Sequence, residues 1–305
     1  MNQSRQQNLN YIKRYWSLYL MLILPMAFFI IFKYIPMQYI QIAFKKYSIV
    51  QSVWDMPWVG FEHFTKAFSN RDFIYAIRNT LLLNFLDLIA GFPAPVILAI
   101  LLNELVFKSF KRITQTVLYL PHFLSWIIIC GMALQLFAPT TGLVNILLNK
   151  IGLQSIPFLN EPVNWVATYI LLGVWQSVGW NTIIYLAAIT GINPELYEAA
   201  AIDGAGRLKR IWYVTLPGLR STIFVMLILN LGRILGSEFD RPYALSNKLV
   251  TSVSNVISIF VYNNGIKGLQ FSLTTAVGLF QSVVCVIFLL VANALAKKFG
   301  ERGIW

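Results

Sequence analysis

Six polar or aromatic side chains lie inside long apolar stretches of the sequence, where a polar group is costly and usually faces a cavity or another helix. These residues are Asp87, Gln176, Trp180, Asn230, Arg233 and Gln281. Within each stretch, polar and small positions recur every three, four or seven residues and so share one helix face. Amides, charged groups and aromatic rings are the groups that hydrogen bond to and stack on a ligand in a concave site. We therefore predict that they line a solute pathway, although the same residue types also join helices to each other.

Two of these residues, Asp87 and Arg233, carry charges deep within apolar runs. An ion pair between them is a hypothesis that the sequence raises, because a charge without a partner is costly in a membrane. Further charges, at Glu238, Asp240 and Arg241, follow shortly after Arg233. This cluster has two interpretations: a rim that meets an external partner, or the solvated end of a helix.

A polar loop at residues 191–217 has a pattern of its own. Asn193 followed by Pro194 indicates a helix start, with the asparagine as the cap and the proline at the first helical position. Gly204 is suited to end this short, alanine-rich helix in a left-handed conformation. A second short helix, basic and aromatic, is expected next, and Pro217 marks the entry into the following apolar run. The pattern indicates a docking element on a membrane face or, alternatively, an amphipathic helix that rests on lipid headgroups.

Six stretches are long and apolar enough to cross a bilayer, which takes about 20 residues as a helix. They cover roughly 16–35, 77–103, 113–138, 164–190, 213–236 and 271–296. Of the 305 residues, 57% are hydrophobic and only 12% are charged, whereas soluble domains carry about 25% charged residues. These features exclude a soluble or a disordered chain and predict an all-α integral membrane protein with six transmembrane helices.

The net charge of +12 is explained by the enrichment of Lys and Arg in cytoplasmic connections, so we infer no nucleic-acid partner. The short basic connections and both chain ends fall on one side when six helices cross the membrane. We therefore expect both termini in the cytoplasm, with residues 1–15 and 297–305 as the two ends. Residues 16–76 would form the first helix and an outer aromatic segment, and residues 77–296 the core transmembrane domain.

The sequence carries no pattern typical of catalysis or metal binding. It has no phosphate-binding loop of the G-x-x-x-x-G-K-[ST] type and no nucleophile elbow. Its histidines, His63 and His122, have no partner at metal-ligand spacing, and Cys130 and Cys285 lie inside apolar runs. We predict a protein that is not an enzyme and has no catalytic residues, metal site or cofactor of its own.

The loop also carries a recognisable signature. Glu198-Ala199-Ala200, then three residues, Gly204, nine residues and Val214-x-Leu216-Pro217 resembles the EAA signature of ABC importer permeases. The family usually has Ile where this chain has Val214. The segments at 13–16, 32–37, 43–45 and 58–64 resemble carbohydrate permeases of the maltose class, in a Gram-positive branch associated with complex oligosaccharides.

This resemblance implies a type I ABC importer permease fold in the bacterial cytoplasmic membrane, with a cytoplasmic EAA coupling helix. The residues expected to couple it to an ATPase are Glu198, Ala199, Ala200, Gly204, Leu216 and Pro217. The implied partners are two ATPase subunits that hold ATP and Mg, a second homologous permease in a heterodimer, and an extracellular solute-binding protein. The implied cargo is a sugar or oligosaccharide.

Other readings stay open from the sequence. A permease for a non-sugar solute would share the EAA signature, and a homodimer is an alternative to the heterodimer. An ion-coupled secondary transporter would need acidic groups in the membrane and repeated, broken helices, and Asp87 is the one acidic candidate. An enzyme or a channel has less support still.

Overall fold

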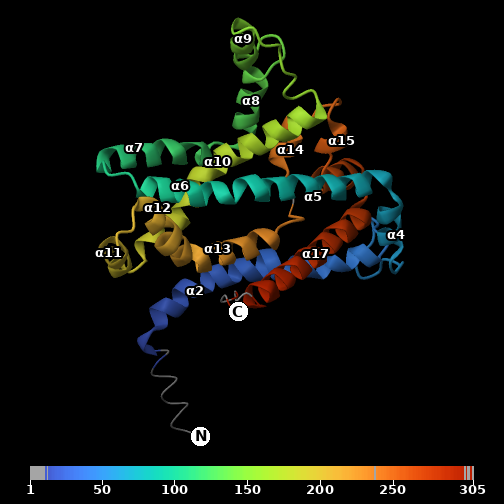
Figure 1. Cartoon of the computed structure of the whole chain (residues 1–305). Helices are drawn as coiled ribbons and strands as arrows, with labels where there is room; N and C mark the ends of the chain where they lie inside the picture. The colour runs from blue at the N-terminus through green and yellow to red at the C-terminus, as the bar shows by residue number, and fades with distance from the viewer. Residues whose placement is uncertain (1–10, 12, 237, 299, 301–302, 304–305) are drawn as a thin grey trace.

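The computed structural model of the chain describes Tyr11 and residues 13–236, 238–298, 300 and 303. Every regular element within this part is helical, apart from an isolated bridge between Lys45 and Trp58. The predicted all-α class is therefore confirmed (Figure 1). The predicted cytoplasmic ends at 1–15 and 297–305 lie largely outside the described residues.

Five continuous helical stretches are long and apolar enough to cross a membrane: Trp16–Phe44, Arg71–Asn103, Pro162–Thr190, Arg207–Leu231 and Phe271–Lys298. A sixth is a bent pair, Lys108–Phe123 and Trp126–Leu136, whose halves differ in direction by 100°. The six predicted spans are thus present if the bent pair counts as one. The fifth begins and ends earlier than predicted, since the basic segment Arg207–Arg210 within the loop at residues 191–217 is already helical.

The individual elements subdivide these stretches. The membrane helices are α2 (Trp16–Phe29), η1 (Ile30–Tyr34), α3 (Ile35–Met37), η2 (Gln38–Phe44), α5 (Arg71–Gly91), α6 (Pro93–Asn103), α7 (Lys108–Tyr119), η3 (Leu120–Phe123), α8 (Trp126–Leu136), α10 (Pro162–Thr190), α12 (Arg207–Arg210), η4 (Ile211–Thr215), α13 (Leu216–Leu231) and α17 (Phe271–Lys298). The connecting helices are α4 (Glu62–Ser69), α9 (Leu143–Lys150), α11 (Pro194–Ile202), α14 (Asp240–Leu245), α15 (Thr251–Ser254), α16 (Ile257–Val261) and η5 (Tyr262–Lys267).

The bend in the third span has a local cause. Pro121 lies in the short 3-10 turn η3 and cannot donate a backbone hydrogen bond. Leu124 and Ser125 then adopt extended conformations, and the Ser125 hydroxyl accepts a hydrogen bond from the backbone N–H of Ile128 at 3.4 Å. Ser125 therefore caps a new helix, α8, which stands away from α7 with α9 at its tip (Figure 1). Hydropathy alone predicted one span here because it does not register a change of direction.

The long helix α10 is the centre of the packing. It contacts α5, α6, α7 and α13, while α17 contacts α4, α13 and η2. Gly179 of α10 lies so close to α7 that an added Cβ would overlap the backbone carbonyl of Leu118. Four buried clusters lie between these helices, and the largest joins α8, α10 and the segment around α14 and α15.

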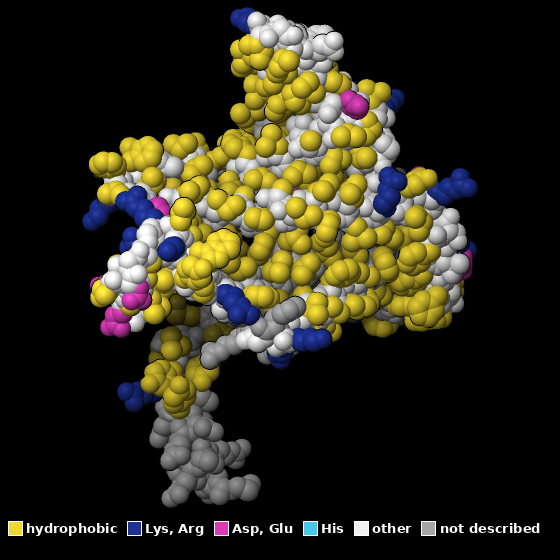
Figure 2. All heavy atoms as spheres, viewed as in Figure 1, with side chains coloured by type: hydrophobic (Ala, Val, Ile, Leu, Met, Phe, Trp, Pro, Cys, Tyr) yellow, Lys and Arg dark blue, Asp and Glu magenta, His cyan; other side chains and the backbone are white. Residues whose placement is uncertain are grey.

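The aromatic segment that was predicted to lie outside the membrane packs around the ring of Phe44. Trp58 stacks on it at 5.4 Å, and Phe61 and Phe64 contact it at 5.5 and 5.4 Å between ring centroids. Apolar side chains cover most of the visible surface of the chain (Figure 2). A soluble protein rarely exposes such continuous apolar area, whereas lipid covers it in a membrane. The chain is therefore a multi-pass membrane protein.

Candidate functional site

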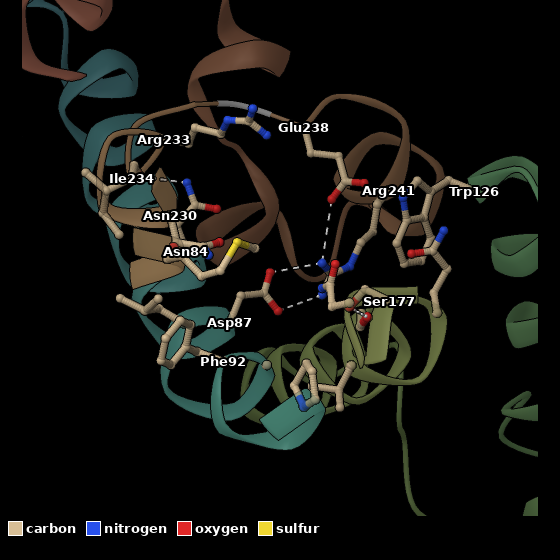
Figure 3. A pocket seen from close by; sticks show the side chains of 18 of the residues that line it. Asn84, Asp87, Phe92, Trp126, Ser177, Asn230, Arg233, Ile234, Glu238 and Arg241 are labelled. Atoms are coloured by element: carbon tan, nitrogen blue, oxygen red, sulfur yellow. Dashed lines mark hydrogen bonds and ion pairs between the residues drawn. The ribbon is translucent and has the colours of Figure 1, made fainter. Parts of the chain in front are cut away.

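A cavity of about 270 Å³ lies between α5, α6, α10, α13 and the chain that leads from α13 to α14 (Figure 3). Four of the six predicted pathway residues line it: Asp87 from α5, Gln176 from α10, and Asn230 and Arg233 from the end of α13 and the following turn. The helical spacing of polar positions thus brings residues from three separate spans into one cavity.

The charged pair in this cavity differs from the hypothesis. Asp87 accepts two hydrogen bonds from Arg241, at 2.9 and 3.1 Å, and makes no ion pair with Arg233 in the described part of the chain. Arg241 is only 3% exposed, so it is neither a rim residue nor part of a solvated helix end. The chain after α13 folds back toward α10 and carries α14 inward, which distance along the sequence could not predict.

Aromatic rings and backbone surround the guanidinium of Arg241. Its Cζ lies 3.5 Å from the ring centroid of Tyr169 and 5.0 Å from that of Trp126, and it also donates to the Tyr169 carbonyl. A side chain at Gly173 would overlap the guanidinium, so glycine at this position leaves room for it. The Nε of Arg241 is buried without a hydrogen-bond partner among the described residues.

Glu238 is the second carboxylate in the lining, and Arg241 Nη1 lies 3.6 Å from it. Partial burial raises the pKa of the Glu238 carboxyl above its ordinary value, and the attraction of Arg241 acts in the opposite direction. Arg241 thus contacts both acidic groups of the cavity, and Figure 3 shows it between them.

Two predicted pathway residues do not line the cavity. Trp180 stacks on His122, with ring centroids 4.5 Å apart and the planes 6° from parallel. Gln281 donates from its side-chain amide to the carbonyl of Leu235, so it joins α17 to the turn after α13. Both residues pack elements together, which is the alternative role that the sequence left open.

Several lining residues were not among the predicted pathway residues. Ser177 and Asn181 of α10 follow Gly173 at intervals of four residues and line the cavity with it, and this spacing could have identified them. Trp126 and Arg241 had no such signal, since Trp126 follows the bend in the third span and Arg241 lies in the connection between α13 and α17.

The coupling loop has the predicted local structure. The Asn193 side chain accepts a hydrogen bond from the backbone N–H of Glu195 at 3.1 Å, and α11 begins at Pro194. Gly204 has a φ of +74°. Ala205 N–H donates to the Ala200 carbonyl at 2.8 Å, and Gly204 N–H donates to the Ala201 carbonyl at 3.1 Å. These two bonds form a Schellman motif, which needs a left-handed residue at this position.

The residues of the EAA signature divide into an exposed part and an internal part. Helix α11 has no buried residue, and Glu198 and Ala199 are exposed on it. The apolar side chains of Leu196 and Ile202 are also exposed, at 54% and 86%. Leu216, in contrast, is half-buried and packs against the cluster between α6, α10 and α13, whereas Pro217, in the first turn of α13, is exposed.

A hydrogen bond connects the exposed helix to the internal part of the signature. The hydroxyls of Tyr197 in α11 and Thr215 in η4 lie 3.1 Å apart. Thr215 is buried and directly precedes α13, and Arg207 to Leu231 form one continuous helical stretch. A displacement of α11 would therefore act directly on the helix that carries Asn230 at the cavity.

Comparison with known proteins gives consistent matches over nearly the whole chain. Residues 91–301 match the family described as binding-protein-dependent transport system inner membrane component. Protein LplB of Bacillus subtilis is 44% identical over 96% of this chain and 92% of its own length. The polygalacturonan/rhamnogalacturonan transport system permease protein YteP of the same organism is 44% identical over 94% of this chain and 90% of its own.

The fold has a close counterpart among solved structures. A chain in the crystal structure of a bacterial alginate ABC transporter, in complex with an alginate pentasaccharide-bound periplasmic protein, aligns with a TM-score of 0.88 at 39% identity. The alignment covers 97% of this chain and 99% of that one.

Proposed function

The chain belongs to the family of binding-protein-dependent transport system inner membrane components, and on this premise we propose that it carries a complex oligosaccharide through its polar cavity. It is a membrane-spanning permease subunit of an ABC importer and a transport component rather than an enzyme. The observation that carries the proposal is the cavity of about 270 Å³, in which amides, charges and a tryptophan converge from α5, α8, α10 and α13.

The chemistry of the cavity supports a saccharide over an apolar solute. The side chains of Asn84, Gln176, Asn181 and Asn230 offer amides, and Trp126 offers a ring. Sugars need both kinds of contact, because hydroxyl groups form hydrogen bonds while the C–H faces of the ring stack on aromatic rings. The names of the relatives, which refer to polygalacturonan/rhamnogalacturonan and to alginate, agree with this class of solute.

We further propose that α11 docks on an ATPase subunit at the cytoplasmic face, and that a second, homologous permease completes the pathway. Support comes from the exposure of Glu198, Ala199 and the apolar residues beside them. ATP binding and hydrolysis would occur on the partner, and motion of α11 would pass through Tyr197 and Thr215 into α13. In this proposed arrangement both termini lie in the cytoplasm, and the solute-binding protein acts on the other side.

The ion-coupled alternative loses its main support. Asp87, its one acidic candidate, is paired with a buried arginine at 2.9 Å and is therefore poorly suited to bind and release a coupling cation. A permease for a non-sugar solute stays the second candidate, because the EAA signature says nothing of the cargo.

The test is purification of the tagged chain from its native membrane in a gentle detergent, followed by mass spectrometry and reconstitution. We expect an ATPase with a phosphate loop, a second permease and an extracellular binding protein to copurify, and the reconstituted complex to take up oligosaccharides on addition of ATP. The proposal is wrong if the chain purifies alone and no ATPase is captured by a cross-linker placed at residue 198.

A further inference from the structure

The charges in the cavity lining are unevenly paired. The lining holds the acids Asp87 and Glu238 and the bases Arg233 and Arg241. Arg241 is 2.9 Å from Asp87 and 3.6 Å from Glu238, so it contacts both acids. No carboxylate of the described residues lies within ion-pair distance of Arg233, which is exposed. The four charges of the lining sum to zero, but Arg233 is the one cation among them that no described carboxylate contacts.

The amides near Arg233 are oriented with their oxygens available. The side-chain nitrogen of Asn84 donates to the carbonyls of Ile234 and Gly236, at 2.7 and 3.1 Å. The side-chain nitrogen of Asn230 donates to the Met226 carbonyl at 2.8 Å. Neither amide oxygen accepts a hydrogen bond from any described residue. Such oxygens are acceptors for hydroxyl groups, so a hydroxyl-rich solute would find acceptors beside the free guanidinium.

The turn that carries Arg233 is held firmly. Its N–H donates to the Asn230 carbonyl at 3.0 Å, and its carbonyl accepts from the N–H of Gly236 at 2.7 Å. A Cβ on Gly232 would lie 2.7 Å from a methyl group of Leu289 in α17, so the turn sits tightly against that helix. Figure 3 shows Arg233 on this turn at the edge of the cavity, apart from the pair between Asp87 and Arg241.

We propose that Arg233 binds the carboxylate of an acidic sugar, so that the permease selects oligosaccharides that contain uronic acid. The inference rests on the oligosaccharide transport proposed above. A guanidinium binds a carboxylate through two parallel hydrogen bonds, while the oxygens of Asn84 and Asn230 accept from the sugar hydroxyls. Without Arg233 the lining would carry one net negative charge and would repel an acidic solute. Arg241 cannot take this role because its charge is already neutralised.

A first experiment measures binding directly in the reconstituted complex. Phenylglyoxal modifies exposed arginines, and peptide mass spectrometry gives the rate at Arg233 and at Arg71, an exposed arginine outside the cavity lining. Trigalacturonate is expected to slow modification at Arg233 but not at Arg71, and its fully methyl-esterified form to slow neither. Equal protection of Arg233 by both probes, or protection by neither, would overturn the proposal.

A second experiment measures selectivity during transport. Uptake of trigalacturonate relative to its methyl ester is compared between the wild type and Arg233→Gln with the same binding protein, so that the preference of the binding protein cancels. We expect this ratio to fall roughly tenfold to hundredfold, the value of hydrogen bonds to a charged group. Arg233→Lys should retain part of the preference, since it keeps the charge, and Arg71→Gln should retain all of it.

The two possible failures are distinguishable. If the wild-type complex takes up no oligosaccharide at all, oligosaccharide transport is the part that fails, and the protection experiment still decides whether Arg233 binds carboxylates. If uptake proceeds and Arg233→Gln leaves the ratio unchanged, the role of Arg233 is wrong while transport stands.

Discussion

The guanidinium of Arg241 donates two hydrogen bonds to the carboxylate of Asp87, at 2.9 and 3.1 Å, although 154 positions separate the two residues in the sequence. The pair joins the second membrane span to the connection between α13 and α17. It places a neutral pair on one side of the cavity, and Arg233 is the cation of the lining that no described carboxylate contacts.

Removal of one partner of this pair should cost more than removal of both. Asp87→Asn leaves the buried Arg241 with Glu238, 3.6 Å away, as its one remaining carboxylate among the described residues, and we expect a loss of about 3 kcal/mol in the free energy of unfolding. The double variant Asp87→Asn/Arg241→Met should recover part of that loss, because methionine fills a similar volume without a charge. Thermal unfolding of the detergent-solubilised chain measures both, and equal stability of the single variant and the wild type would contradict the structural role of the pair.

Glu198 offers a test of coupling that leaves the fold untouched. The residue is exposed on α11 and makes no ion pair or hydrogen bond through its side chain within the described part of the chain. We therefore expect Glu198→Lys to fold normally but to reverse the charge that an ATPase would meet, so that the complex assembles poorly or loses transport-linked ATP hydrolysis.

The measurement for Glu198 is ATPase activity with and without loaded binding protein, together with copurification of the ATPase. Glu198→Gln should give an intermediate result, since it keeps the size and removes only the charge. Normal stimulation of the ATPase in Glu198→Lys would show that another part of the loop carries the coupling.

Gly204 and Gly206 form a matched pair for testing the end of α11. An added Cβ meets no atom within 4 Å at either position, so steric overlap with neighbours is absent in both. Gly204 has a φ of +74°, whereas Gly206 has an ordinary φ of −66°. A side chain in the left-handed region costs about 1–2 kcal/mol, so Gly204→Ala should disturb the loop and reduce coupled ATPase activity while Gly206→Ala should not. An identical response of both variants would mean that the Schellman motif does not matter for coupling.

The coupling loop was predictable because its signals are local. A cap at Asn193, a proline at the first helical position and a glycine in the left-handed region act within a few residues. The helical spacing of polar residues likewise identified the helix faces that carry Asp87, Gln176 and Asn230. These properties depend only on the helix that contains each residue.

The partner of Asp87 was not predictable, because it depends on how an irregular connection folds back on the helices. Arg241 is preceded by a turn and lies in the short helix α14, whose path no periodicity describes. Pro121 and Ser125 do indicate the bend between α7 and α8, as a helix-breaking residue and a helix cap. Hydropathy averaged over the whole stretch does not reveal them. Trp180 and Gln281 illustrate the same limit of sequence analysis. Their spacing identified the helix face on which they lie, but not the element that packs against that face.

Helices α7 and α10 approach each other closely, and a glycine-to-alanine substitution at their contact should destabilise the chain. Helix propensity alone would predict that the same substitution stabilises it. Alanine favours a helix over glycine by about 1 kcal/mol, and Gly131 in α8 has no atom within 4 Å of an added Cβ. Gly131→Ala should therefore stabilise the chain.

At Gly179 the added Cβ would overlap the backbone carbonyl of Leu118, and the backbone cannot rotate away as a side chain can. Gly179→Ala should then lower the free energy of unfolding by about 1–3 kcal/mol, the usual cost of overpacking. Thermal unfolding of both variants in the same detergent measures the difference, and a stabilised Gly179→Ala would show that α7 and α10 lie further apart than this packing requires.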